Sequence, residues 1–207
     1  MRTEKERMIA GDLYSSIDNQ ELKDGMLKAR IILHEFNYSH PTEEEKRQRL
    51  IRELFGKTSE LFLVEQPFKC DHGFNISVGE GFFANFDCIM LDGAPITIGD
   101  RVCLGPRVGL YTADHPLDKD VRSSCVEFSS PITIGDDVWL GAGVIVMPGV
   151  SIGSNVIVGA GSIVTKDIPD NVIAVGNPCK VLRMLTHKDK EYWDTLLADY
   201  RAELEQI

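Results

Sequence analysis

A six-residue period over residues 76–175 limits the folds open to this chain more than any other feature. An aliphatic residue recurs every six positions, glycine commonly follows it, and the fifth place is small or β-branched. A helix cannot carry this period, because 3.6 residues per turn would spread the aliphatic side chains around the whole cylinder. The clearest run, residues 134–169, reads IGDDVW, LGAGVI, VMPGVS, IGSNVI, VGAGSI and VTKDIP.

Short strands separated by tight corners fit the six-residue period. Each hexad then forms one flat side of a coil with its aliphatic side chain inside, and Gly, Asn and Asp supply the backbone angles of the corners. Three hexads close a triangular coil, and stacked coils bury one continuous aliphatic column. IGDRVC and LGPRVG at residues 98–109 keep the same phase. The sequence therefore predicts a mainly β fold, a parallel β-helix, over residues 61–185.

Helical patterns flank the repeats on both sides. Residues 1–60 show helical periodicity, with Ala29, Leu33 and Phe36 on one face. Pro41, followed by Thr42 and three glutamates, suits the start of a second helix in this segment. Residues 186–207 predict a C-terminal helix whose apolar stripe packs against the body or a neighbouring subunit: Trp193, Leu196, Leu197 and Tyr200.

Composition excludes several classes of partner and site. A net charge of −10 disfavours nucleic acid or an anionic membrane as the main partner, because no large basic patch is evident. No apolar run approaches the ~20 residues that span a bilayer, and the N-terminus is too charged for a signal peptide. We therefore expect a cytoplasmic protein. The five cysteines contain no CxxC pair, which argues against a disulfide framework or a zinc site.

One polar insertion interrupts the hexads. The repeats stop at Thr112 and resume at Pro131, which leaves an irregular loop over residues 113–130. Insertions into repeat folds project from one corner and often form the binding face. His115 stands at the base of this loop, where a neutral imidazole could accept a proton. From the residues alone, His115 is either a general base or a solvent-exposed bystander.

Several stretches of the chain are similar to the maltose/galactoside O-acetyltransferase family of hexapeptide-repeat acyltransferases. They are MIAGDLY at 8–14, ANFDCIMLD at 84–92, YTADHP at 111–116, IVTKDIP at 163–169 and GNP at 176–178. The resemblance covers nearly the whole chain and is closer to the maltose branch. It implies a left-handed coil, a homotrimer, and direct transfer of an acetyl group from acetyl-CoA to a hydroxyl of a sugar such as maltose or glucose. It implies no metal requirement.

The same resemblance assigns roles to individual residues, with His115 as the catalytic base. Contacts to the acceptor sugar are implied for Asp71, Asn85, Asp92 and Glu127. Glu127 has the alternative role of orienting His115. Contacts to acetyl-CoA are implied for Ala142, Ala160, Thr165, Lys166 and Arg183. Lys180 is expected to lie near the CoA phosphates together with Lys166 and Arg183. Trp139 is expected to form a wall of the CoA groove, with ordinary surface packing as the alternative, and the Ala142 amide is expected to stabilise the oxyanion.

A few positions depart from the galactoside branch. Ala142 and Asp71 stand where those enzymes carry serine, so the Ala142 amide remains without a hydroxyl. Gly93 replaces an acid, and the acceptor contact is for that reason assigned to Asp92. Ser16 aligns with an acid that touches the sugar, which puts that contact in doubt.

Other functions remain as alternatives to a sugar acetyltransferase. The γ-class carbonic anhydrases use the same coil but bind a metal through three histidines, and of the histidines here only His115 belongs to the main repeats. A β-helix scaffold or ice-binding surface would need regular threonine-rich faces, whereas the outward positions here are mixed. A closer alternative keeps the reaction and changes the acceptor to a galactoside, an amino sugar, serine, an antibiotic or a lipo-oligosaccharide precursor.

Overall fold

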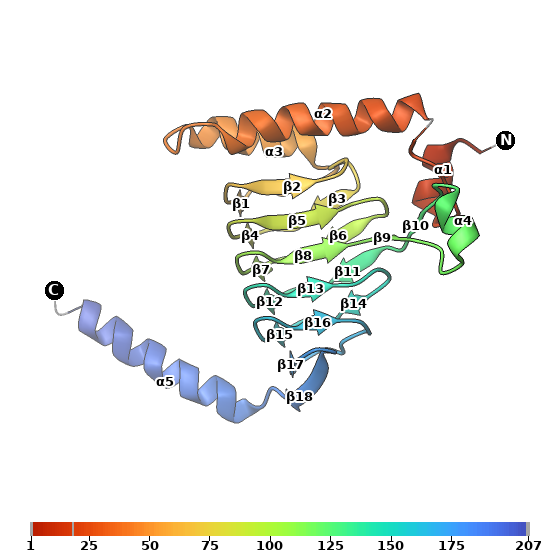
Figure 1. The fold of residues 1–207 in the computed structure, drawn as a ribbon. Coiled ribbons are helices and arrows are strands. Elements are labelled where there is room, and N and C mark those ends of the chain that lie inside the picture. The colour runs from red at the N-terminus through yellow and green to blue at the C-terminus, as the bar shows by residue number, and fades with distance from the viewer. Residues whose placement is uncertain (1, 18, 206–207) are drawn as a thin grey trace.

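The computed structural model describes residues 2–17 and 19–205 of the 207-residue chain. It consists of a parallel β-helix with helices at one end and a C-terminal helix at the other (Figure 1). The predicted β-helix is thereby confirmed. Met1, Asp18, Gln206 and Ile207, which belong to the expected terminal segments, lie outside the described residues.

Three helices lie at the N-terminal end of the prism: α1 (Glu4–Ala10), α2 (Gln20–Asn37) and α3 (Glu44–Leu54). Thr3 and Glu6 form a capping box on α1, and Asn19 caps α2 by accepting from the Leu22 amide. Most buried residues of α2 and all those of α3 belong to the same core as the strands, and they include Leu33, Phe36, Ile51 and Leu54. These two helices thus close one open end of the aliphatic column.

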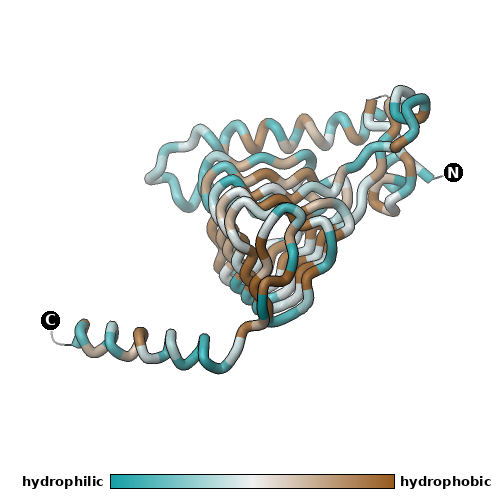
Figure 2. The backbone as a smooth tube through the Cα atoms, turned by 60° about the horizontal axis from the view of Figure 1, so that its bottom comes forward, coloured by the Kyte–Doolittle hydropathy of each residue, from teal (hydrophilic) through white to brown (hydrophobic). Residues whose placement is uncertain are grey.

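The strands form the three sides of a triangular prism, seen nearly end-on in Figure 2. Side I contains β1 (Phe62–Val64), β4 (Phe82–Ala84), β7 (Cys103–Leu104), β12 (Trp139–Leu140), β15 (Ile157–Val158) and β17 (Val172–Val175). Side II contains β2 (Phe68–Cys70), β5 (Cys88–Leu91), β8 (Gly109–Tyr111), β13 (Ile145–Val146) and β16 (Ile163–Val164). Side III contains β3 (Ile76–Val78), β6 (Ile96–Ile98), β11 (Ile132–Ile134) and β14 (Ser151–Ile152). Parallel pairing in strict register stacks the inward aliphatic side chains of successive coils.

The outward faces of the three sides differ in polarity. Successive side chains of a strand point to opposite faces, so one residue in two points outward. On side III these outward residues are Ser77, Thr97, Thr133 and Ser151. On side II they include Ile89, Ile145 and Ile163, each half-buried, with Lys69 in the first coil. Side II therefore offers an apolar surface that side III lacks.

Two segments leave the prism in opposite directions (Figure 1). The insertion begins with β9 (Ala113–Asp114), continues through α4 (Lys119–Ser123) and returns by β10 (Phe128–Ser129), which pairs antiparallel with β9. At the other end β18 (Lys180–Met184) pairs antiparallel with β17 and leads into α5 (His187–Leu204). In the described part of the chain, no helix combines the length and apolarity needed to cross a bilayer.

Candidate functional site

Most of the predicted site residues lie along the two edges of side II. We call the corners between sides I and II the glycine edge; it contains Asn85–Asp87, Gly105–Arg107, Gly141–Gly143 and Gly159–Gly161. We call the corners between sides II and III the histidine edge; it contains Asp71, Asp92, Thr112–His115 and Thr165–Lys166. The four residues of β5 alone span about 13 Å between these edges. One chain therefore holds the predicted residues in two separate groups.

The glycine edge is built from backbone. A Cβ on Gly105 would lie 2.7 Å from the amide nitrogen of Ala142, and a Cβ on Gly141 would lie 2.6 Å from that of Ala160. Only glycine permits this approach of successive corners. Gly143 has a left-handed φ of 68° and open space where a side chain would begin.

Two free amides face this edge at the positions predicted for acetyl-CoA. Ala142 and Ala160 are exposed and lie in adjacent coils, where the Gly161 amide donates to the Ala142 carbonyl at 2.8 Å. Neither alanine amide donates a hydrogen bond to any described residue. Exposed, unpaired amides can donate to carbonyl oxygens of a ligand. The structure thus brings Ala142 and Ala160 together and leaves Asn85 on the same edge.

At the histidine edge, the Asp92 side chain is buried and hydrogen-bonded to the backbone of a neighbouring corner. Its carboxylate is fully buried and accepts from the backbone amides of Asp71 at 3.1 Å, His72 at 2.9 Å and Asn75 at 3.3 Å. Burial raises the pKa of Asp92, and the backbone donors act against that rise. Both carboxylate oxygens accept from backbone amides of the chain, and the predicted acceptor contact of Asp92 stays a prediction. Asp92 holds the turn that presents Asp71.

Asp71 lies half-buried beside other acids. Burial raises its pKa to about 6, and the neighbouring charge of Asp92 adds to the effect. The charge of Glu127 acts in the same direction, which places Glu127 near Asp71 in space. The structure thus brings together two of the residues predicted to face the acceptor.

The N-terminal segment before α2 positions Glu127. Tyr14 and Glu127 exchange two backbone hydrogen bonds of 3.0 Å, and the Ser16 hydroxyl donates to Glu127 Oε1 at 3.1 Å. The buried Tyr14 hydroxyl lies 3.4 Å from Ser129 Oγ, and burial raises the pKa of Tyr14. Tyr14 and Ser129 also fill the space where a side chain on Gly93 would start. Sequence reasoning missed Tyr14 and Ser129, since 115 residues separate them.

A cavity of about 320 Å³ joins the loop to this segment. Its walls come from Ser16, Ile17, His115, Arg122, Cys125, Val126 and Glu127. His115 is exposed, and its backbone amide donates to Asp114 Oδ1 at 2.7 Å. Arg122 Nη1 donates to the carbonyls of Pro116 at 2.8 Å and Leu117 at 3.0 Å, which braces the residues after His115. An imidazole and a carboxylate therefore share one solvent-accessible cavity.

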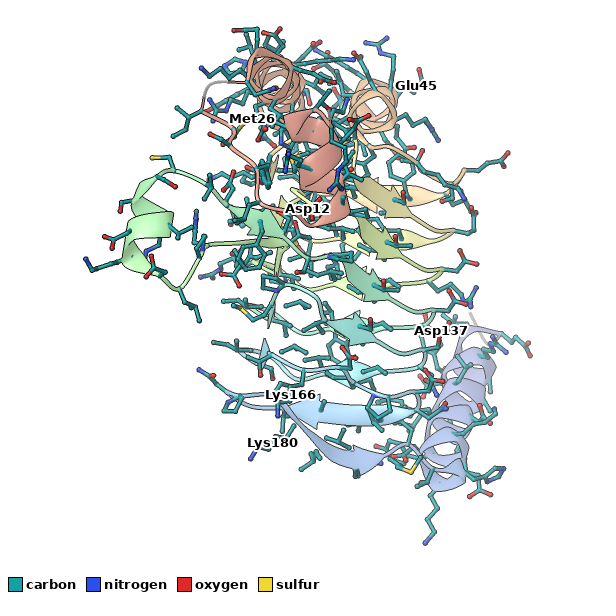
Figure 3. The ribbon with its side chains drawn as sticks, turned by 90° about the vertical axis from the view of Figure 1, so that its right-hand side faces the viewer. Asp12, Met26, Glu45, Asp137, Lys166 and Lys180 are labelled. Carbon is teal, nitrogen blue, oxygen red and sulfur yellow. The ribbon has the colours of Figure 1, made fainter. Side chains whose placement is uncertain are left out.

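The residues predicted to bind CoA phosphates lie at the far end of the prism. Figure 3 shows Lys166 and Lys180 at the end away from α2, and both are exposed, as is Thr165. Arg183 is already paired with Asp189 through contacts of 2.6 and 2.8 Å. The pairing with Asp189 directs the guanidinium toward the junction with α5, and the predicted role of Arg183 at the CoA phosphates stays a prediction.

Trp139 lies on the outer face of side I, in register with Cys103 and Ile157, and its side chain is 55% exposed. It stands one position before Leu140, at the approach to the glycine edge, so both predicted roles remain open.

Among residues 2–17 and 19–205, no three His, Cys, Asp or Glu side chains are grouped as they would be around a metal ion.

Several known proteins are similar to this chain in sequence and in structure. The family model for the maltose acetyltransferase hexapeptide capping motif matches residues 7–59, and the model for six bacterial transferase hexapeptide repeats matches residues 131–166. Galactoside O-acetyltransferase from Escherichia coli is 43% identical over 198 residues, covering 96% of each chain.

Two solved structures have a TM-score of 0.88 to this chain. A maltose O-acetyltransferase from Clostridium difficile is 49% identical and aligned over 89% of this chain and 98% of its own. A galactoside acetyltransferase in complex with coenzyme A is 43% identical, over 92% and 94% respectively.

Proposed function

Because the chain belongs to the maltose/galactoside family of acetyl-CoA-dependent sugar O-acetyltransferases, we propose that it acetylates a hydroxyl of maltose, glucose or a related glucoside directly. The observation that carries this proposal is the cavity at the histidine edge. There His115 and Glu127 line the same space, and Asp71 lies beside Glu127. A base next to hydrogen-bond acceptors is what a polyhydroxyl acceptor requires.

In the proposed reaction His115 takes the proton of the acceptor hydroxyl. The freed oxygen attacks the thioester carbonyl, and a tetrahedral intermediate with a negative oxygen forms. The unpaired Ala142 amide would donate to that oxygen. Collapse of the intermediate breaks the carbon–sulfur bond, and the CoA sulfur recovers the proton from His115. Asp71 and Glu127 would accept hydrogen bonds from other hydroxyls of the sugar.

The proposed cofactor site combines the free amides with exposed cations. The amides of Ala142 and Ala160 would donate to the amide carbonyls of the pantetheine arm. Lys166 and Lys180 would attract the phosphates in an otherwise acidic chain, and Thr165 adds a hydroxyl beside them. The proposed mechanism uses no metal. Five free cysteines agree with the cytoplasm as the proposed compartment.

A homotrimer is part of the proposal, because the two edges are too far apart in one chain to form one site. Asn85 and His115 lie on opposite edges of side II, so they meet only if they come from different copies. A ring of three copies with side II facing inward would set the histidine edge of one copy against the glycine edge of the next. It would also bury the outward isoleucines of side II, including Ile145 and Ile163.

An amino sugar is the alternative acceptor that a specific observation favours. Glu127 lines the cavity of His115, and its charge acts on the carboxyl of Asp71, so the acidic side chains of this region would attract an ammonium group. Burial and the charges of Asp92 and Glu127 raise the pKa of Asp71, whereas the charges of His72 and Arg30 act against that rise.

A thiol-release assay with acetyl-CoA tests the proposed function across glucosides, galactosides, amino sugars, serine and antibiotics. We expect the highest kcat/KM for glucosides. A tenfold preference for an amino sugar would replace the proposed acceptor and keep the chemistry. Absence of acceptor-dependent thiol release across the whole panel would contradict the proposal.

A further inference from the structure

The helix α5 has an apolar stripe that no described residue of its own chain covers. None of its 18 residues is buried among the residues that the structure describes. Trp193 is 66% exposed, and the stripe continues along one helical face through Leu196, Leu197, Tyr200 and Leu204. A lone helix of this length is marginal in water, and a contiguous exposed apolar surface marks an interaction site.

The junction between β18 and α5 fixes the direction of the helix. Arg183 holds Asp189 in the first turn through two short contacts, and Asp189 also accepts from the Thr186 amide at 2.8 Å and the Thr186 hydroxyl at 2.9 Å. The Leu185 amide donates to the Asn171 carbonyl at 2.8 Å, which ties the junction to the prism. With this direction the helix extends away from its own body in both views (Figures 1 and 2). The stripe therefore needs another molecule as its partner.

The charge of α5 disfavours an anionic membrane as that partner. Interfacial helices that bind anionic lipids carry an excess of Lys and Arg on the polar face. The acids of α5 outnumber its bases: Asp189, Glu191, Asp194, Asp199 and Glu203 against Lys188, Lys190 and Arg201.

We propose that a second copy of this chain covers the stripe, so that α5 is an arm linking neighbouring subunits of the ring. The inference rests on the trimer proposed above. α5 leaves the prism on the side opposite the loop that carries α4 (Figure 1). In a head-to-tail ring, the side opposite the loop of one copy faces the loop side of the next. Each copy then gives one arm and receives one, and the arm strengthens the same contact that completes the active site.

Site-specific photo-crosslinking tests the arm in the full-length protein. A benzophenone amino acid at Tyr200 lies within the stripe, and the same group at Ala202 lies on the opposite helical face as the matched control. We expect a product of twice the 23.1 kDa chain mass from position 200 and little from position 202. Equal yields of crosslinked product from both positions would contradict the proposal that α5 contacts a neighbouring subunit. So would the absence of this product from position 200 in a sample that sediments as a trimer.

A single charge within the stripe gives a second, independent measurement. Leu197→Asp would place an unpaired carboxylate in the contact, and Ala202→Asp would place the same group on the opposite face. We expect Leu197→Asp to weaken subunit association by roughly 100-fold in sedimentation, and Ala202→Asp to change it little. Unaltered association of Leu197→Asp would contradict the arm, whereas a wild-type protein that is monomeric and active would contradict the proposed trimer itself.

Discussion

The two edges of side II differ in chemistry, although the same repeating coil builds both. The glycine edge presents backbone amides and methyl groups, because Gly105 and Gly141 admit no side chain against the next corner. The histidine edge presents an imidazole and carboxylates. Of the side chains at its cavity, His115 and Glu127 come from the insertion, and Glu127 is held by Ser16 of the N-terminal segment.

The glycine edge consists of backbone positions that every coil repeats, whereas the cavity at the histidine edge is lined by side chains that can vary. Backbone positions in a stack of coils are set by the coil geometry, so they suit a ligand whose structure stays constant, such as a cofactor. Side chains on an insertion can change without disturbing the core, so they suit the acceptor, which differs among related enzymes. We expect substitutions at the corners of Ala142 and Ala160 to affect mainly acetyl-CoA, and substitutions of His115, Asp71 and Glu127 to affect mainly the acceptor.

His115→Ala should give the largest effect at the histidine edge. Removing a general base lowers kcat by ~10²–10⁴-fold, and the KM for acetyl-CoA should stay the same because the glycine edge is intact. Steady-state kinetics of the folded variant measure both quantities. His40→Ala, an exposed histidine between α2 and α3, is the control. A His115→Ala enzyme with more than about a tenth of the wild-type kcat would rule out the general base.

Mixing two inactive variants tests whether the edges of neighbouring copies combine. Asn85→Ala damages the glycine edge and His115→Ala damages the histidine edge, so a site between the two kinds of copy can be fully intact. Random assembly of equal amounts should restore about a quarter of the sites. Activity is measured after joint refolding and compared with each variant refolded alone. Mixed oligomers without any recovery would show that one chain supplies both residues.

The fold could be predicted from the sequence because each six-residue repeat specifies its own strand and corner, without reference to distant residues. Every hexad repeats the same demand for an inward aliphatic residue and a corner, so Val138, Leu140 and Val144 are buried as the pattern requires. The stacked corners at Ala142 and Ala160 follow from the same period.

The orientation of single polar residues depends on partners that are distant in sequence. The sequence does not show whether an acidic side chain at a corner points inward or outward. Asp92 points inward because backbone amides from 17 to 21 residues earlier donate to its carboxylate. Arg183 is occupied by Asp189, which only the strand-to-helix junction brings into reach. The roles of His115, Glu127 and Lys166 remain predictions.

Alanine substitutions of Gly141 and Gly143 test whether the close approach of successive corners shapes the glycine edge. Gly141→Ala should lower the free energy of unfolding by roughly 2–3 kcal/mol, because its Cβ would meet the Ala160 amide at 2.6 Å and the backbone must shift. Gly143→Ala should cost about 1 kcal/mol, because its Cβ meets open space and only the left-handed φ opposes it. Urea unfolding of both variants measures the difference. Equal losses would mean that close approach of the corners does not shape this edge.

Asp71→Asn should give the smallest effect, and its sign distinguishes a functional carboxylate from a structural one. The pKa of Asp71 rises from 3.8 to about 6 on folding, mainly through burial. Between about pH 4 and pH 6 the folded protein therefore binds more protons than the unfolded chain, and this group makes stability fall as the pH rises.

Replacing Asp71 with asparagine removes that penalty. We expect a gain of roughly 1 kcal/mol in the free energy of unfolding at pH 7 and none below about pH 4, well under the full value of the shift because the side chain is partly solvated. Asp137→Asn provides the opposite sign, since the hydrogen bond from Arg101 lowers the pKa of Asp137 and its loss should destabilise at neutral pH. The acceptor KM of Asp71→Asn should rise while the acetyl-CoA KM stays constant. An enzyme that is less stable at pH 7 and binds the acceptor normally would show that Asp71 holds the fold rather than the sugar.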